Sequence, residues 1–244
     1  MMKQAIQAYL TDRRYERIDL KSVLFDMDGV LYDSMPNHAK AWHEVMALHG
    51  YDLSLEDAYL HEGRTGADTI RIICRRQGVS LSDEAITALY GEKTEAFHTY
   101  PEAPRMPGSY ELLQKVVRDG LAPMVVTGSG HPLLLDNLNM YFPDIFRRDR
   151  MVTAFDVKYG KPHPEPYLMA LEKGHLQPWE AFVVENAPLG VEAAHAAGLF
   201  TIAVNTGPLP DSCLLDAGAN LLFPDMFALS EAWNTLREEL RIEN

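Results

Sequence analysis

The chain has 244 residues, of which 47% are hydrophobic and 23% are charged, and its formal net charge at pH 7 is −13. A protein of this length and composition can bury a complete hydrophobic core, either as one large domain or as a core with a smaller second domain. The negative charge makes nucleic acid and anionic membranes poor partners.

Two further features indicate a cytoplasmic protein. The two cysteines, Cys74 and Cys213, lie far apart, which is typical of free, buried thiols in a reducing compartment. No segment reaches the roughly 20 apolar residues that a membrane-spanning helix needs. Arginines follow the first apolar residues too closely for a signal peptide. We therefore expect a cytoplasmic protein, and we expect it to be a monomer.

The first 20 residues are predicted to form a short amphipathic helix and a linker. Ala5, Ile6, Tyr9 and Leu10 share one face at helical spacing. We expect this N-terminal extension to pack against the outside of a core that begins near Lys21.

A buried strand is expected over residues 22–26, where an apolar run with β propensity ends at Asp26. Asp28 follows two residues later, and alternate side chains of an extended strand point the same way, so both carboxylates could approach one point. Gly29 would let the chain turn tightly after them. Paired carboxylates suit Mg²⁺, and they also suit a division of labour in which one acid attacks and the other moves a proton. On this motif alone, a strand-end turn with two solvated acids stays an open alternative.

Four helical segments are predicted next, over residues 36–50, 54–60, 66–77 and 82–98, with glycines near the breaks between them. Their position between the first strand and the rest of the chain suggests a separate helical cap, with hinges near residues 32–37 and 101–108. Such a cap would control the access of water to a reaction site.

From residue 107 onward, helical and strand patterns alternate. Helices are expected over residues 109–119, 132–140, 165–173, 189–197 and 225–240, and strands over residues 122–126, 151–153, 181–184, 200–204 and 220–222. Strands separated by helix-length segments imply a parallel sheet with helices on both faces. The predicted fold class is therefore α/β, a doubly wound parallel sheet with a small helical cap inserted after the first strand.

Polar side chains follow three of the predicted strands at their carboxyl ends. Thr127 follows the strand at 122–126, and Glu185 and Asn186 follow the strand at 181–184. Because the carboxyl ends of parallel strands share one edge of the sheet, these groups should converge with Asp26 and Asp28. The topology therefore predicts one site at this edge.

Two further groups could handle an anion at this site. The hydroxyl of Thr127 and the backbone amides of Gly128 and Ser129 could hold a phosphoryl oxygen at a helix start, although Thr127 could also be a simple helix N-cap. Lys161, fixed between a glycine and a proline, could offset the repulsion between a carboxylate and an anionic substrate. The alternative for Lys161 is a lysine in a surface loop. Lys158 is the weaker candidate because no proline follows it.

Four motifs along the chain resemble, in the same order, those of the haloacid dehalogenase-like phosphotransferase superfamily. They are the string Asp26-Met27-Asp28-Gly29-Val30-Leu31-Tyr32-Asp33-Ser34, then Thr127 after its apolar strand, then Lys161-Pro162, and then Val183-Val184-Glu185-Asn186-Ala187-Pro188-Leu189-Gly190. Pro36, His38 and Trp42 resemble the β-phosphoglucomutase-like branch. The resemblance covers the chain from about residue 21 onward, and it implies an extension at 1–20, a core at 21–35 and 106–244, and a helical cap at 36–105.

The resemblance also implies a two-step reaction. Asp26 would take the phosphoryl group as an aspartyl phosphate, and Asp28 would act first as an acid and then as a base. Thr127 and Lys161 would stabilise the phosphoryl oxygens.

The cofactor implied by the resemblance is Mg²⁺, held by Asp26, Asp28, Glu185 and Asn186. The family commonly has two acids in its fourth motif, whereas this chain has Glu185 followed by Asn186. An asparagine can still ligate a metal through its carbonyl oxygen, but it removes one negative charge. Glu62, in the predicted cap, is a candidate for the missing acid, and we hypothesise that it joins the metal when the cap closes.

Other residues of the cap could contact the substrate. We expect Arg64 and Lys93 to face a small anionic substrate, with an ordinary exposed loop as the alternative for the segment around Arg64. By resemblance, His38 would hydrogen-bond near the acid and base residue. Packing on the helix surface near Trp42 is the alternative for His38. His131, at the start of the helix after the second strand, could reach the edge of the site.

The pattern as a whole predicts a Mg²⁺-dependent phosphohydrolase that acts on a small phosphorylated substrate. The glutamate and arginine on either side of Gly63 depart from the mutase pattern. They suit a compact, strongly anionic substrate, so inorganic pyrophosphate is the favoured substrate. A β-phosphoglucomutase or a sugar-phosphate phosphatase is the first alternative. A protein that only binds phosphate, without catalysis, is the second.

Overall fold

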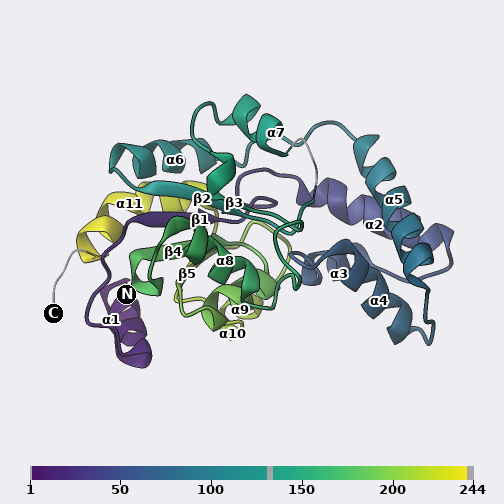
Figure 1. The fold of residues 1–244 in the computed structure, drawn as a ribbon, viewed down its shortest axis with the longest axis horizontal. Helices are drawn as coiled ribbons and strands as arrows, with labels where there is room; N and C mark the ends of the chain where they lie inside the picture. Colours follow the sequence, from purple (N-terminus) through teal and green to yellow (C-terminus); the bar gives the residue numbers. More distant parts are fainter. Residues whose placement is uncertain (1, 131–133, 241–244) are drawn as a thin grey trace.

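The computed structural model describes residues 2–130 and 134–240. Within them, six strands form one parallel sheet in the order β3-β2-β1-β4-β5-β6 (Figure 1). The strands are β1 (Ser22–Phe25), β2 (Ala122–Val126), β3 (Met151–Val152), β4 (Ala181–Glu185), β5 (Phe200–Val204) and β6 (Leu221–Phe223). The predicted α/β class is confirmed, and β1 lies inside the sheet between β2 and β4.

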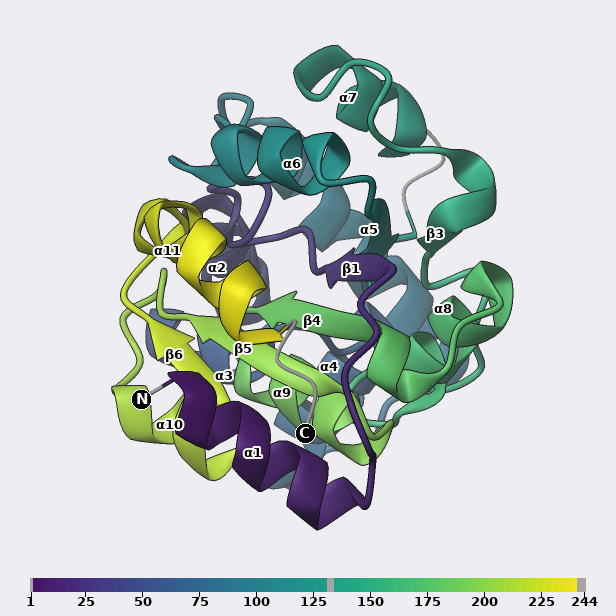
Figure 2. The ribbon, with the colours of Figure 1, turned by 90° about the vertical axis from the view of Figure 1, so that its left-hand side faces the viewer.

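Helices cover both faces of the sheet, because successive side chains of each strand point to opposite faces. Val23 and Phe25 of β1 pack in the same cluster as α6 (Ser109–Arg118) and α11 (Met226–Leu240). Leu24 packs with residues of α8 (Glu165–Gly174) and α9 (Pro188–Ala196). Figure 2 shows the two pairs of helices on opposite sides of the sheet. The buried strands therefore lie between two apolar layers.

The N-terminal helix α1 (Met2–Arg13) packs against this core through the predicted apolar stripe. Ile6, Tyr9 and Leu10 are buried. The hydroxyl of Tyr9 donates a hydrogen bond to the carbonyl of Gly198, at a distance of 2.8 Å. The extension thus adds buried apolar surface on the side of the molecule that carries α11.

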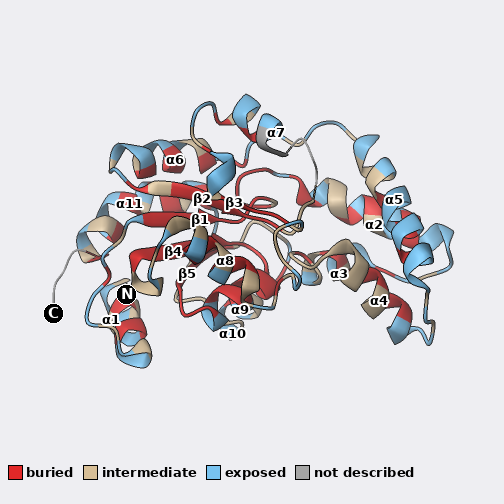
Figure 3. Ribbon diagram, viewed as in Figure 1, coloured by how far each residue is buried: buried red, intermediate tan, exposed pale blue. Residues whose placement is uncertain are grey.

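Four helices follow β1, and they have a hydrophobic core of their own. They are α2 (Met35–Leu48), α3 (Leu55–Leu60), α4 (Gly66–Arg76) and α5 (Asp83–His98). The buried residues of this helical insertion are Val45, Met46, Leu53, Ile70, Ile73, Cys74, Ile86 and Leu89. Figure 3 shows buried positions on the inner faces of these helices, at a distance from the buried strands. The four predicted helices are therefore present, and they lie beyond the carboxyl ends of the strands (Figure 1).

A few elements differ from the sequence predictions. The helix α10 (Asp211–Asp216) was not predicted, because six residues are too few to show a helical repeat. The helix expected at 132–140 is α7 (Leu134–Tyr141), and its expected first residues lie outside the described part of the chain. Both cysteines are free, but Cys213 is only partly buried. Within the described residues, no helix combines the length and the apolar character that crossing a bilayer requires.

Candidate active site

The carboxyl ends of β1, β2 and β4 meet at one edge of the sheet, as the topology predicts. Phe25 pairs with Val125 on one side and with Val184 on the other, so the three strands end at the same level. Asp26 then follows β1, and Thr127 follows β2. The backbone amide of Asp26 donates to the carbonyl of Val184 at 3.0 Å, so hydrogen bonding to the sheet continues through this residue.

Lys161 joins these three strand ends through its ammonium group. The Nζ atom donates hydrogen bonds to a carboxylate oxygen of Asp26, to Glu185 Oε1 at 2.6 Å and to the carbonyl of Val126 at 3.1 Å. An ammonium group has three N–H donors, so all of them are used. Lys161 is 2% exposed, whereas Lys158 lies on the surface.

The buried charges around Lys161 are mostly negative. Burial raises the pKa of Asp26 to about 8; the ammonium of Lys161 acts against this rise, and the carboxylates of Glu185 and Asp28 add to it. Burial also lowers the pKa of Lys161, but Asp26 and Glu185 outweigh burial, so its net shift is upward. The site therefore has an excess of buried acid over the single ammonium at its centre, and an additional cation would be favourable there.

Asp28 has a different environment from Asp26, although the two lie in one motif. Ser34 Oγ donates to Asp28 Oδ1 at 2.5 Å, and His38 Nε2 lies 3.4 Å from the same oxygen. Burial alone would raise the pKa of Asp28, but His38 and Ser34 outweigh burial and the net shift is downward. The pKa values of the two aspartates therefore move in opposite directions, as expected of acids that perform different tasks.

Lys93 lies behind His38 and has little contact with solvent. Its Nζ atom is 2.7 Å from His38 Nδ1, and the ring of His38 stacks on Phe97. Nζ also lies over the ring of Trp42, 5.1 Å from its centroid. Burial lowers the pKa of Lys93 to about 8, against the attraction of Asp28. Lys93 thus contacts His38, and it also lines the cavities beside the aspartates, so its predicted contact with a substrate stays a prediction.

Glu62 reaches the sheet edge from the helical insertion. Asn186 Nδ2 donates to Glu62 Oε1 at 2.9 Å, and both residues are buried. Burial raises the pKa of Glu62 well above its ordinary value, with Asp26 as the next largest cause. Gly29, at φ +77°, makes room for this contact, because a Cβ atom there would lie 2.1 Å from Asn186 Nδ2. The predicted neighbours Glu62 and Asn186 are therefore in direct contact.

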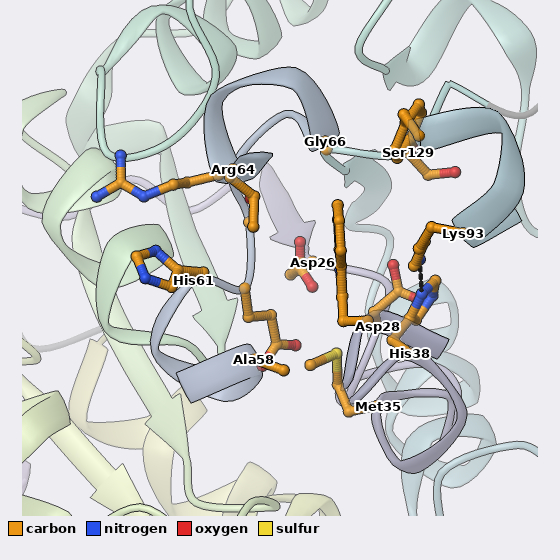
Figure 4. A pocket seen from close by; sticks show the side chains of 16 residues that line it. Asp26, Asp28, Met35, His38, Ala58, His61, Arg64, Gly66, Lys93 and Ser129 are labelled. Carbon is orange, nitrogen blue, oxygen red and sulfur yellow. Dashed lines mark hydrogen bonds and ion pairs between the residues drawn. The ribbon is translucent and has the colours of Figure 1, made fainter. Parts of the chain in front are cut away.

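A small cavity of about 90 Å³ lies between the insertion and the strand ends, and His38, Glu62 and Lys93 form part of its wall (Figure 4). Asp26, Asp28, Gly128 and Ser129 are among its lining residues. Thr127 Oγ1 accepts a hydrogen bond from the backbone amide of Ser129 at 3.0 Å, so the hydroxyl proton of Thr127 takes no part in this bond. Residue His131, predicted at the edge of the site, lies outside the described residues.

Arg64 does not point toward Asp26. Figure 4 shows its guanidinium group directed away from the aspartates, on the same side of the loop as His61. The backbone carbonyl of Arg64 instead lies close to Gly128, where an added Cβ atom would be 3.4 Å from it. The loop predicted from the sequence lines the cavity, but the direction of a side chain from a loop depends on packing that no local pattern reveals.

The residues present fit a magnesium ion. Asn186 Oδ1 is buried and has no hydrogen-bond partner in the described structure, and it lies at the same sheet edge as the two aspartates. Among the described residues, no group of three or more His, Cys, Asp or Glu side chains could hold a metal by itself. Mg²⁺ does not require such a group, because it commonly binds through one or two carboxylates together with waters and substrate phosphate. An amide oxygen beside two aspartates is a suitable partial set of ligands.

Glu185 occupies a different place from the metal-ligand position predicted for it. Its Oε1 accepts hydrogen bonds from Lys161 and from the hydroxyl of Tyr167, and its Oε2 accepts from the backbone amides of Asn186 and Ala187. It is fully buried. The geometry makes Glu185 the counter-ion of Lys161. Two residues that contact the acids of the site were not predicted from the sequence: Ser34, which donates to Asp28, and Tyr167, which donates to Glu185. Only Ser34 had a signal, as the last residue of the first motif.

The comparisons with known proteins agree with this geometry. The family model of the haloacid dehalogenase-like hydrolases matches residues 23–204. This chain belongs to that family. The recognition made from the four motifs is thereby confirmed, and the chain is an enzyme of the phosphatase and phosphomutase type.

Several relatives of this haloacid dehalogenase-like enzyme have specific names. A structure described as "Putative beta-phosphoglucomutase from Bacteroides vulgatus" is 60% identical, with a TM-score of 0.96 over 99% of this chain and 98% of that one. A fructose-1-phosphate phosphatase of Escherichia coli is 35% identical over an alignment of 202 residues that covers 78% of this chain and 98% of the relative. Hexitol phosphatase A of Escherichia coli is 34% identical over 188 residues, covering 76% of this chain and 83% of the relative.

The buried ammonium of Lys93 predicts a pH-dependent contribution to stability. Its folded pKa of about 8 is below its ordinary value of 10.5, so above about pH 8 the folded protein releases a proton that the unfolded chain still holds. The stability of the wild type should therefore rise, relative to that of Lys93→Met, by roughly 2–3 kcal/mol between about pH 7 and pH 10. Urea denaturation of the metal-free proteins across this range measures the difference.

The matched control for this experiment is Lys40→Met, because Lys40 is exposed on α2 of the same insertion. Its unfolding free energy should follow that of the wild type at every pH. If the unfolding free energy of Lys93→Met also followed that of the wild type at every pH, burial of the Lys93 ammonium would not reduce stability below pH 8.

Proposed function

We propose that the protein is a magnesium-dependent phosphohydrolase that works through an aspartyl phosphate on Asp26, with inorganic pyrophosphate as its substrate. The observation that carries the proposal is the ammonium of Lys161, bonded to Asp26 and Glu185 at the ends of neighbouring strands. A fixed positive charge beside a nucleophilic carboxylate lowers the repulsion that an anionic phosphate would otherwise meet. The family membership supports the reaction type.

In the first half of the proposed reaction, a carboxylate oxygen of Asp26 attacks phosphorus. A new bond forms between Asp26 and phosphorus, the bond from phosphorus to the leaving oxygen breaks, and Asp28 donates a proton to that oxygen. Lys161 and the hydroxyl of Thr127 stabilise the phosphoryl oxygens during this step. Ser34 and His38 hold Asp28 in place.

In the second half, Asp28 accepts a proton from a water molecule that attacks the aspartyl phosphate, which releases phosphate and restores Asp26. The residues that would hold Mg²⁺ are Asp26, Asp28, Asn186 through Oδ1, and Glu62 from the insertion. When bound, Mg²⁺ supplies positive charge that offsets the repulsion between the carboxylates and the anionic substrate. Glu185 serves as the counter-ion of Lys161 and not as a direct ligand.

The contact between Glu62 and Asn186 supports the choice of pyrophosphate. An aspartate at position 186 would repel Glu62, whereas the amide of Asn186 donates a hydrogen bond to it. The missing acid of the fourth motif is thereby replaced by an acid from the insertion. With the insertion in this position the cavity measures about 90 Å³, well below the roughly 300–1,000 Å³ of typical small-molecule pockets. A space of this size suits an inorganic phosphate group better than a sugar phosphate.

A sugar-phosphate phosphatase or a β-phosphoglucomutase is the second candidate, and a specific feature favours it. A larger cavity of about 670 Å³ adjoins the first and shares Asp28, His38 and Lys93 with it. Its volume is in the range of sites that bind small organic molecules. The names of the relatives, which include phosphatases of fructose 1-phosphate and of hexitol phosphate, point the same way.

A substrate panel separates the two candidates. With Mg²⁺ present, we expect phosphate release from pyrophosphate at a kcat/KM at least about tenfold above that for fructose 1-phosphate, hexitol phosphates and glucose phosphates, because only a compact substrate lets Glu62 reach the sheet edge. Conversion of glucose 1-phosphate into glucose 6-phosphate should be absent. Chelation of Mg²⁺ should abolish turnover. Released phosphate and interconverted glucose phosphates are measured directly.

Two variants serve as controls for the panel. Asp26→Asn should abolish turnover of every substrate, whereas Asp33→Asn, at an exposed aspartate in the same motif, should leave it unchanged. Activity in Asp26→Asn would remove the mechanism. A preference for a sugar phosphate, with the mechanism intact, would establish the second candidate instead.

Glu62→Gln tests the part of the proposal that concerns the insertion. The change keeps the shape of the side chain and removes its charge, so the affinity for Mg²⁺ should fall by roughly 10–100-fold. Isothermal titration calorimetry with MgCl₂ measures this directly, and the Mg²⁺ concentration for half-maximal activity should rise in parallel. Glu56→Gln, at an exposed position on α3, is the matched control. An unchanged Mg²⁺ affinity in Glu62→Gln would show that Glu62 has no part in holding the metal.

A further inference from the structure

Tyr167 lies inside the protein beneath the site, where no solvent reaches it. It comes from α8, and its hydroxyl donates a hydrogen bond to Glu185 Oε1 at 2.7 Å. The ammonium of Lys161 lies over its ring, 5.3 Å from the centroid. Tyr167 therefore contacts both members of the ion pair that supports Asp26, without lining the cavity that holds the reacting groups.

Glu185 has no unused hydrogen-bonding capacity. A carboxylate offers about four acceptor positions. Glu185 uses them for Lys161, Tyr167 and the amides of Asn186 and Ala187. Its carboxylate is also confined, because a Cβ atom at Gly190 would lie 1.8 Å from Oε1. The side chain consequently cannot turn to find a new partner if one of these donors is removed.

Lys161 is shared between two carboxylates. Asp26 and Glu185 each accept one of its N–H groups, and the third goes to the carbonyl of Val126. The two carboxylates compete for one ammonium, and the position of Nζ between them depends on how strongly each attracts it. A neutral donor on Glu185 Oε1 weakens the attraction on that side.

We propose that Tyr167 is a positioning residue for phosphoryl transfer. Its hydroxyl satisfies part of the charge of Glu185, so that Lys161 remains within reach of Asp26 and of the phosphoryl group that Asp26 receives. Tyr167 touches neither substrate nor metal, and its effect passes through Glu185 to Lys161. This role rests on the proposed attack by Asp26, but it does not depend on which phosphorylated compound is the substrate.

The change Tyr167→Phe removes one hydroxyl and keeps the ring. Glu185 then loses a donor in a site that admits no replacement, and its charge is balanced by Lys161 alone on that oxygen. The ammonium should move toward Glu185 and away from Asp26. Because the contact of Lys161 with the phosphoryl group matters most in the transition state, kcat should fall about tenfold while KM changes by less than about twofold.

Tyr9→Phe is the matched control. Tyr9 is also a buried tyrosine, 3% exposed, and its hydroxyl also makes one hydrogen bond, to the carbonyl of Gly198. It lies on α1, outside the site, so its kcat and KM should equal those of the wild type. Thermal unfolding of both variants shows how much stability each hydroxyl contributes, which separates a loss of stability from a loss of positioning.

Kinetics are measured with whichever compound of the substrate panel the wild type hydrolyses best, so a wrong substrate assignment leaves this test intact. A crystal structure of metal-free Tyr167→Phe gives a second measurement that needs no activity. We expect Lys161 Nζ farther from Asp26 and still bonded to Glu185, with no such shift in Tyr9→Phe. Unchanged kcat in Tyr167→Phe, or an unmoved Lys161 in its crystal structure, would overturn the proposal.

Discussion

The site depends on one ammonium group that holds three neighbouring strand ends together. Lys161 comes from the loop before α8. It donates hydrogen bonds to Asp26 after β1, to the carbonyl of Val126 at the end of β2, and to Glu185 at the end of β4. A buried carboxylate is unfavourable without a partner, and here Asp26 and Glu185 share a single cation. The arrangement leaves an excess of negative charge at the sheet edge. Burial is the largest cause of the raised pKa values of Asp26 and Glu62, and the neighbouring carboxylates add to it. The excess negative charge favours the binding of a further cation.

The helical insertion supplies part of the charge of the site. Glu62 belongs to the loop after α3, yet it contacts Asn186 at the end of β4. In the arrangement we propose, the core alone is one acid short, and the full set of oxygen ligands exists only with the insertion in place. Binding of the metal and substrate would then favour closure, and closure would exclude water from the aspartyl phosphate until the leaving group has departed.

Much of this structure could be predicted from the sequence, because the signals are local. The apolar strands, their spacing by helices and the polar residues at their ends specify a parallel sheet with one reactive edge, and Pro162 distinguished Lys161 from Lys158. The contacts that depend on packing could not be predicted. Three such contacts are the inward turn of Glu185, the approach of Tyr167 from another element, and the direction of Arg64 away from the aspartates. They follow from tertiary packing that has no sequence period.

In the proposed reaction, Asp26 receives the phosphoryl group while Lys161 stays beside it. A crystal structure grown with magnesium and beryllium fluoride, a stable mimic of a phosphoryl group on a carboxylate, tests this most directly. We predict a beryllofluoride group bonded to a carboxylate oxygen of Asp26, with Lys161 Nζ and the hydroxyl of Thr127 within hydrogen-bonding distance of its fluorine atoms. A beryllofluoride group on any other side chain, or a Lys161 that has turned away from it, would contradict the account.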